Sequence, residues 1–367
     1  MQLWGDIILE HLHAHYLPTG HLVYAHAGIL MAVPFDLKSL SVTGPPVQVL
    51  RGVLANPDVG YSCLAVARSG NLVYVTGAER TERASTQVVW VSRDGKESPA
   101  STAPRAYEDM SIAPDRKMAA FTIPADPVWN IWILGLERGN LSRLTFTGDN
   151  RDPVWSPDGR HVAYTSFRDG HFGIYWSAVD GSSPELRLSS NQFEPYVRTF
   201  TRDGKKLIFV GRNSAGEGTS WEVALTGDAT PAPLKNLGGG DPNDFSPDGK
   251  WIVYASAETG QSEIYVQPYP GPGGKWQVSS GGGTHARWSP DGRGIFFRHG
   301  DTMMSAAVQT QPRFASDTPH VLFTGHYQHT GIDYETDGRR FLMIKAADQK
   351  GPTSLQVVLN WTRELKK

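Results

Sequence analysis

The stretch DPVWSPDGRHVAYTS, residues 152–166, joins two extended segments through a tight turn. Pro157 presets the first corner of a type I turn, Asp158 suits the second corner, and Gly159 can adopt the left-handed conformation that follows. Such a turn makes a three-residue β-hairpin with a bulge. The second strand, VAY at 162–164, is apolar on both faces, as expected of a strand that is covered on both sides. The stretch therefore predicts an inner hairpin between other sheets.

This signature recurs along the whole chain. Clear copies surround Gly204, Gly249, Gly292 and Gly338, and weaker copies centre on Gly20, Gly70 and Arg116. With Gly159, these eight turn positions follow one another at intervals of 50, 46, 43, 45, 45, 43 and 46 residues, taken as differences of their residue numbers. A period of this size indicates a repeat array.

Each repeat continues with a further apolar strand, such as residues 173–181, and usually with a shorter fourth strand, such as 185–190. Four antiparallel strands in about 45 residues are typical of a β-propeller blade. We expect an all-β chain that forms one propeller domain over residues 1–367 with eight blades, or seven if the first and last repeats share a sheet. The expected repeat units are 12–55, 56–104, 105–148, 149–191, 192–238, 239–281, 282–327 and 328–367.

The last repeat lacks an obvious outer strand, which would leave an exposed sheet edge. Either the C-terminal residues TRELKK or the N-terminal segment Asp6 to His11 can supply it. We expect Ile7 to Glu10 to pair with Leu355 to Trp361 and to close the ring.

A large aromatic residue stands two positions before the proline slot of four turns, and we expect these side chains to pack between adjacent blades. They are Trp155, Phe200, Phe245 and Trp288.

Composition excludes several classes of protein. The net charge is −2, with acidic and basic residues interleaved, so no basic block is available to bind nucleic acid. Cys63 is the only cysteine, which excludes an internal disulfide, and we interpret it as a small buried side chain. We find neither a signal-peptide pattern nor about 18 consecutive apolar residues, so no membrane segment is expected here. The compartment stays open: either the cytosol, or the soluble part of a longer protein.

The W-S-P-D-G-R hairpins resemble the repeats of TolB-like propellers, which are similar to the propellers of prolyl-oligopeptidase-type peptidases. More narrowly, four stretches resemble the extracytoplasmic propeller of bacterial eukaryotic-like serine/threonine kinases: YLPTGHLVYA (16–25), LMAVPFDLKSLSVTGPPVQVL (30–50), YVQPYPGPGGKWQVSSGGG (265–283) and VVLNWTRELKK (357–367). That resemblance covers nearly the whole chain and implies a periplasmic or extracellular location.

Motifs of catalysis are missing from the sequence. No kinase glycine loop, catalytic lysine or H-R-D segment occurs, and no G-x-S-x-G elbow is present for a serine hydrolase. The glycine-rich stretches at 211–218 and 271–276 join strand to strand, so we interpret them as hairpin loops rather than as a nucleophile site or a phosphate loop. We expect no enzymatic activity and no cofactor.

Two groups of residues are candidates for binding. His11, His13 and His15 alternate, so on a strand they would share one face and form a weak metal-site candidate, with a solvated edge strand as the alternative. Residues that enter the innermost strands would line the mouth of a propeller's channel, and their excess of carboxylates suits a cation, an amine or a basic peptide. The candidates are Asp109, Asp152, Glu194, Asp241, Asp244, His285, Arg287 and Asp333. The alternative for the Asp-Pro pairs is turn initiation.

From these observations we expect a non-catalytic module that binds a protein or a small molecule at a propeller face, most similar to the sensor of a receptor-type kinase. The alternatives are a Tol-like periplasmic scaffold and the propeller of a prolyl-oligopeptidase-type peptidase whose hydrolase domain lies elsewhere.

Overall fold

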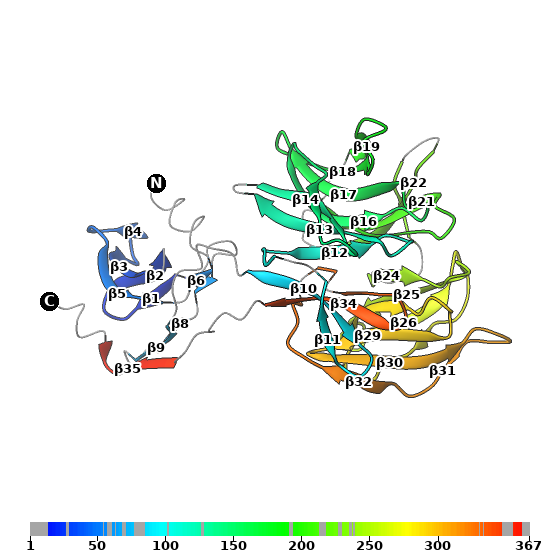
Figure 1. Ribbon diagram of the computed structural model, residues 1–367. Helices are drawn as coiled ribbons and strands as arrows, with labels where there is room; N and C mark the ends of the chain where they lie inside the picture. The colour runs from blue at the N-terminus through cyan, green and yellow to red at the C-terminus, as the bar shows by residue number, and fades with distance from the viewer. Residues whose placement is uncertain are drawn as a thin grey trace. The chain divides into compact units, whose positions relative to one another are not determined.

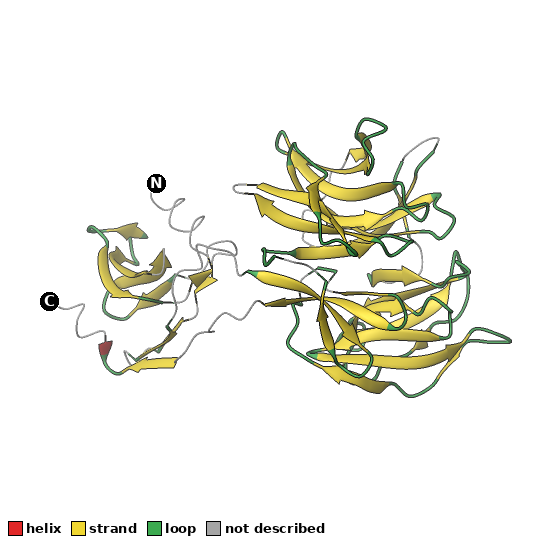
Figure 2. Ribbon diagram, in the orientation of Figure 1, coloured by secondary structure: helices red, strands yellow, loops and turns green. Residues whose placement is uncertain are grey.

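A computed structural model of the chain describes most of its residues. The described ranges are 14–26, 29–53, 55–56, 61–62, 64–67, 71–76, 85–100, 103–125, 128–190, 194–212, 218–226, 230–234, 237, 239–329, 331–332, 334–346 and 355–361. They form β-strands, turns and loops, and the short helical segment drawn red after β35 in Figure 2 is of the 3-10 type, at residue 361. The chain divides into two compact units, residues 85–347 and residues 1–84 with 348–367. Each unit is described by itself.

The unit of residues 85–347 is a propeller whose described residues form six antiparallel sheets (Figure 1). Five sheets have four strands, and the sheet that starts at β28 has five. Apolar residues on both faces of the inner strands lead to this stacking, because each sheet must be covered twice. The four-stranded antiparallel blade predicted from the repeat is confirmed.

The first two blades in chain order contain β12 (Glu108–Ile112), β13 (Met118–Ala125), β14 (Val128–Gly135) and β15 (Leu141–Arg143), and then β16 (Asp149–Trp155), β17 (His161–Arg168), β18 (His171–Ala178) and β19 (Leu186–Ser190). The next two contain β20 (Glu194–Phe200), β21 (Lys206–Arg212), β22 (Gly218–Ala224) and β23 (Ala232–Pro233), and then β24 (Asp241–Phe245), β25 (Trp251–Ser256), β26 (Glu263–Pro268) and β27 (Trp276–Gln277). The five-stranded blade contains β28 (Thr284–Trp288), β29 (Gly294–His299), β30 (Thr302–Gln309), β31 (Ala315–Ser316) and β32 (His320–Thr324), and the closing blade contains β33 (Tyr334–Thr336), β34 (Arg340–Ala346), β10 (Thr86–Ser92) and β11 (Glu97–Pro99).

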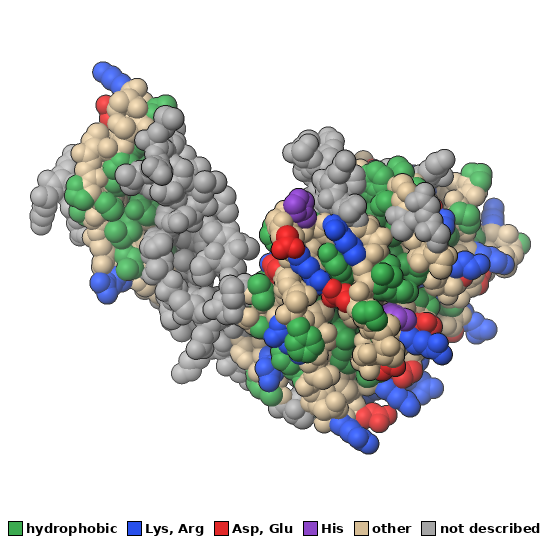
Figure 3. Space-filling model, turned by 90° about the horizontal axis from the view of Figure 1, so that it is seen from above, with side chains coloured by type: hydrophobic (Ala, Val, Ile, Leu, Met, Phe, Trp, Pro, Cys, Tyr) green, Lys and Arg blue, Asp and Glu red, His purple; other side chains and the backbone are tan. Residues whose placement is uncertain are grey.

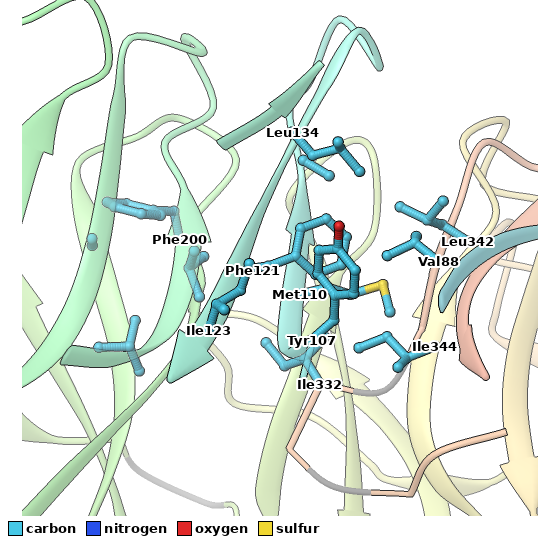
Figure 4. Packing of buried hydrophobic residues seen from close by; sticks show 14 of the residues in the cluster. Val88, Tyr107, Met110, Phe121, Ile123, Leu134, Phe200, Ile332, Leu342 and Ile344 are labelled. Atoms are coloured by element: carbon cyan, nitrogen blue, oxygen red, sulfur yellow. The ribbon is translucent and has the colours of Figure 1, made fainter. Parts of the chain in front are cut away.

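The closing blade combines strands from the two ends of this unit. β34 pairs antiparallel with β10 over seven residue pairs, from Arg340 with Ser92 to Ala346 with Thr86. Figure 4 shows Val88, Leu342 and Ile344 of this blade facing Met110 of the neighbouring blade. The inner strands β12, β16, β20, β24, β28 and β33 contact one another in cyclic order. The six blades therefore form a closed ring.

The other unit contains the remaining strands. A five-stranded sheet holds β1 (His15–Leu17), β2 (His21–His26), β3 (Ile29–Asp36), β4 (Ser41–Val42) and β5 (Val47–Arg51). A three-stranded sheet holds β8 (Leu64–Val66), β9 (Leu72–Val75) and β35 (Leu355–Val358), and β6 (Ala55–Asn56) pairs with β7 (Tyr61–Ser62). The eight sequence repeats are thus distributed over the six blades of the ring and the two larger sheets of this unit.

The strands of the second and eighth repeats are exchanged between sheets. The sequence predicted that β34 and β35 would belong to one blade, which residues 7–10 would complete. Instead β35 pairs with β9 of the second repeat, and β34 pairs with β10 of the same repeat. The strand pairing of these two repeats therefore differs from the pairing that the sequence predicted. The segment Ile7 to Glu10 lies outside the described residues.

The turns of successive inner hairpins interlock. Gly159, Gly204, Gly249, Gly292 and Gly338 all have φ between +69° and +86°, which confirms the predicted left-handed conformation. A Cβ added at Gly159 would lie 3.7 Å from Cδ of Pro114, the proline of the preceding turn. At Gly338 the corresponding distance to Pro290 is 2.9 Å. At Gly159 the distance is an ordinary van der Waals contact, so glycine there serves the backbone conformation, whereas Gly338 also allows the close approach of the previous turn.

The predicted aromatic positions are buried between blades. Trp155, Phe200, Phe245 and Trp288 are each at most 5% exposed. Trp288, for example, packs with Val253 and Ile264 of the preceding blade. These contacts confirm the predicted ring of aromatic side chains.

Candidate functional site

β-Bulges interrupt several inner strands of the propeller unit. Register shifts occur between Glu108 and Met110 in β12, between Arg151 and Val154 in β16, and between Thr284 and Arg287 in β28. The residues within these bulges, Asp109, Asp152 and His285, have φ of 24°, 54° and 51°. Asp and His tolerate this region better than bulky residues. A bulge re-aims its side chain, and all three of these residues line cavities of the channel.

The largest of these cavities, about 520 Å³, lies where β12, β16 and β20 begin, and we call it the entry cavity. It brings together the predicted residues Asp109 and Asp152. Its lining consists of acidic, basic and aromatic side chains: Glu108, Asp109, Trp129, Asp149, Arg151, Asp152, Thr165, Phe167, Phe172, Tyr196 and Arg198, together with Gly331. A cavity of this size suits a small organic ligand or a peptide side chain.

The carboxyl group of Asp109 lies in a crowded acidic setting. Burial, and then the carboxylates of Asp152 and Glu108, raise the pKa of Asp109 to about 8, although Arg198 opposes the shift. Gly331 has φ of +59°, and a Cβ there would fall 1.5 Å from Oδ1 of Asp109. Only glycine at position 331 therefore leaves room for this carboxyl group.

Both arginines of the entry cavity have acidic partners. Arg151 forms an ion pair with Asp149, at 2.9 Å between Nη2 and Oδ2. Arg198 donates from Nε to Oδ1 of Asp241 at 2.6 Å. Arg198 also lines the two neighbouring cavities, so it stands at the junction of the channel.

Deeper in the channel, two of the predicted ligand residues connect blades. Asp244 accepts hydrogen bonds from Nη2 of Arg202 at 2.7 Å and from the backbone N–H of Trp288 at 3.0 Å. Arg287 donates to the carbonyl oxygen of Asn243 at 2.7 Å. Since buried polar groups need such partners, these two side chains have a structural role between blades.

Glu335 stands beside this network. Burial raises its pKa to about 7, while Arg287, with Nε 3.6 Å from Oε2 of Glu335, lowers it. A cavity of about 430 Å³ at the turn end of the channel is lined by Asp244, Arg287 and Glu335, and by four turn prolines, Pro114, Pro157, Pro247 and Pro290.

The other predicted residues are not all brought together. Asp241 and His285 line a smaller cavity of about 140 Å³ next to Arg198. Glu194 begins β20, but its side chain is not among those described, and Asp333, His11 and His13 lie outside the described residues. His15 is in β1 of the other unit. In the described part of the chain, no group of three or more His, Cys, Asp or Glu side chains is arranged to hold a metal ion.

Sequence reasoning missed several lining residues, among them Trp129, Tyr196, Arg198 and Glu335. Tyr196 and Arg198 flank the position in the fifth repeat that corresponds to Asp152 in the fourth. An alignment of the repeats would therefore have found them. Trp129 lies on β14, the third strand of its blade, which no inner-strand pattern indicates.

Comparison with known proteins shows which repeats these resemble. No protein-family model matches the chain. Over 152 residues the chain is 28% identical to the Tol-Pal system protein TolB of Francisella tularensis, which covers 41% of this chain and 35% of that protein. A solved structure of a putative TolB from Agrobacterium tumefaciens matches 73% of this chain and all of its own, with a TM-score of 0.58 and 18% identity. The chain carries TolB-like β-propeller repeats.

The TolB-like repeats also resemble part of a larger protein. Over 161 residues the chain is 30% identical to tricorn protease homolog 1 of Streptomyces coelicolor, which is 43% of this chain and 14% of that protein. The chain thus spans about a third or less of the length of these curated relatives.

Among the described residues, no helix is long and apolar enough to cross a membrane.

Proposed function

We propose that the chain is a non-catalytic binding module, and that its propeller unit takes a ligand in the entry cavity. The observation that carries this proposal is the cavity itself, because it gathers charged and aromatic side chains from three blades at one end of the channel. Ligand sites are commonly concave, with an apolar wall and a few polar groups that fix orientation.

In the wider protein, the module would be the sensor of a receptor-type serine/threonine kinase. The resemblance of residues 16–25, 30–50, 265–283 and 357–367 to the propellers of such kinases supports this role. It would place the module on the periplasmic or extracellular side of a membrane.

A Tol-like scaffold is the second candidate, which the partial identity to TolB favours. In that role the propeller would dock a partner protein rather than report to a kinase. Charges of both signs are interspersed with apolar side chains on the face of the propeller unit seen in Figure 3, as both protein-binding roles allow.

Two measurements test the proposal. The purified chain, assayed with aminopeptidase, prolyl-peptidase and nucleotide substrates, should show no turnover, and turnover that is lost in Asp152→Asn would contradict the binding role. Sequencing the gene around this region separates the two candidates. A kinase and a membrane helix encoded upstream support the sensor, whereas a signal peptide directly upstream supports the scaffold.

A further inference from the structure

The entry cavity carries an excess of negative charge. Its lining includes four carboxyl groups and two guanidinium groups, and the carboxylates still exceed the guanidinium groups when Asp109 holds a proton. The two guanidinium groups, Arg151 and Arg198, already lie against Asp149 and Asp241. The charges of Asp152 and Asp109 also act on Arg198. The guanidinium groups of the lining are nevertheless outnumbered by its acidic groups, Glu108, Asp109, Asp149 and Asp152. An enclosed space of this kind favours a positively charged occupant.

Aromatic rings form a wall of the same cavity. Phe167 and Phe172 stand at the hairpin between β17 and β18 with ring centroids 4.7 Å apart. Trp129 and Tyr196 complete this wall from β14 and β20. The guanidinium carbon of Arg151 lies 4.9 Å from the ring centroid of Trp129, so this wall already accommodates one cation against an aromatic face. Aromatic faces attract cations and also bury hydrocarbon chains.

These two features define one chemical class of ligand. An inorganic cation would use the carboxylates but not the aromatic wall, and an apolar molecule would use only the wall. We propose that the entry cavity binds an organic cation, with its ammonium or guanidinium end at Asp109 and Asp152 and its hydrocarbon part against Phe167, Phe172 and Tyr196. This inference rests on the proposed binding function and names its ligand class.

Binding of such a cation is linked to a proton. Asp109 faces Glu108 on its own strand, Asp152 on β16, Arg198 on β20 and the backbone of Gly331. Its raised pKa means that the empty cavity holds a proton on this carboxyl group near neutral pH. A bound cation stabilises the ionised form, so that proton leaves on binding. Affinity should therefore rise as pH increases toward about 8.

The test is calorimetric titration of the full chain with two probes of nearly equal shape. N-acetylarginine amide carries a guanidinium group, whereas N-acetylcitrulline amide carries a neutral urea. We expect the arginine probe to bind at least about tenfold more tightly, the scale of one charge-assisted contact. Titrations in buffers of different ionisation enthalpy should show proton release for the arginine probe, and none in Asp109→Asn.

Variants locate the site. Asp152→Asn should weaken the arginine probe about tenfold, and asparagine tolerates the positive φ of this position. Glu108→Gln is the second variant, in case the first does not fold. Glu137→Gln is the matched control, since it also removes one negative charge but lies exposed in the turn after β14. It should leave the affinity unchanged.

Each outcome decides the inference. Equal affinity for both probes, no binding of either probe, or equal effects of Asp152→Asn and Glu137→Gln would overturn it. A titration with agmatine distinguishes the source of the cation. If agmatine binds more tightly than the arginine probe, the natural ligand is a free amine; if it binds more weakly, the ligand is a peptide side chain. Mass spectrometry of the probes afterwards separates the two proposals. A hydrolysed probe contradicts the non-catalytic function, whereas an intact probe that does not bind contradicts only the cation.

Discussion

At the scale of single residues, the glycines of the inner turns share one demand, a left-handed backbone, and differ in a second, the space left by the preceding turn. Gly159 and Gly338 both adopt positive φ, at +70° and +86°. They differ in space, because an added Cβ would meet the preceding proline at 3.7 Å in one case and at 2.9 Å in the other. The turn pattern predicts the first demand, and only the packing of neighbouring turns sets the second.

This difference gives a matched pair of variants. Gly159→Ala should lower the free energy of unfolding by about 1–2 kcal/mol, the cost of a left-handed non-glycine residue. Gly338→Ala should cost more, because Pro290 must also move. Denaturant unfolding of both variants measures the two values. Equal losses would show that the proline contact carries no energy.

At the scale of elements, the exchange of strands between the second and eighth repeats decides the architecture. β10 takes β34 as its partner, and β9 takes β35. A hairpin within each repeat would instead pair β9 with β10 and β34 with β35. The exchange places β10 and β34, from the two ends of residues 85–347, in one blade. Each of these strands covers an edge of the other that would otherwise be exposed.

Engineered disulfides test this pairing. In a Cys63→Ser background, cysteines at the partner positions 88 and 344, or at 89 and 343, should crosslink in the native monomer. Two adjacent pairs are tried because antiparallel partners alternate between wide and narrow separations. The control places cysteines at 343 and 357, which would approach each other only in the hairpin of the last repeat. A crosslink in the control but in neither test pair would contradict the exchanged pairing. Non-reducing mass spectrometry of peptides reads out each crosslink.

At the scale of the whole molecule, the sheets of residues 85–347 take all their described strands from within that range. Its ring is closed by its own first and last strands, and its blades share cores such as the one in Figure 4. A unit that completes its own sheets and buries its own core can fold alone.

We therefore expect residues 85–347 expressed by themselves to fold as a monomer with one cooperative thermal transition. A chain that ends at residue 330 is the control, because it lacks β33 and β34 and leaves β10 without its partner. The control should aggregate or melt at a lower temperature. Circular dichroism and size-exclusion chromatography check both. Equal behaviour of the two proteins would mean that the closing blade does not hold the ring together.

The repeat, the inner turns, the four-stranded blades and buried aromatic residues such as Trp155 and Trp288 could all be predicted from the sequence. These features are local, because turn chemistry and alternation act within a few residues. The sequence also pointed to Asp109 and Asp152, since they enter inner strands. Tertiary structure alone decided the rest. The strands of different repeats are interchangeable by pattern, so their pairing depends on which arrangement closes a ring. Likewise Asp244 and Arg287 match the ligand pattern, but their hydrogen bonds across blades give them a structural role.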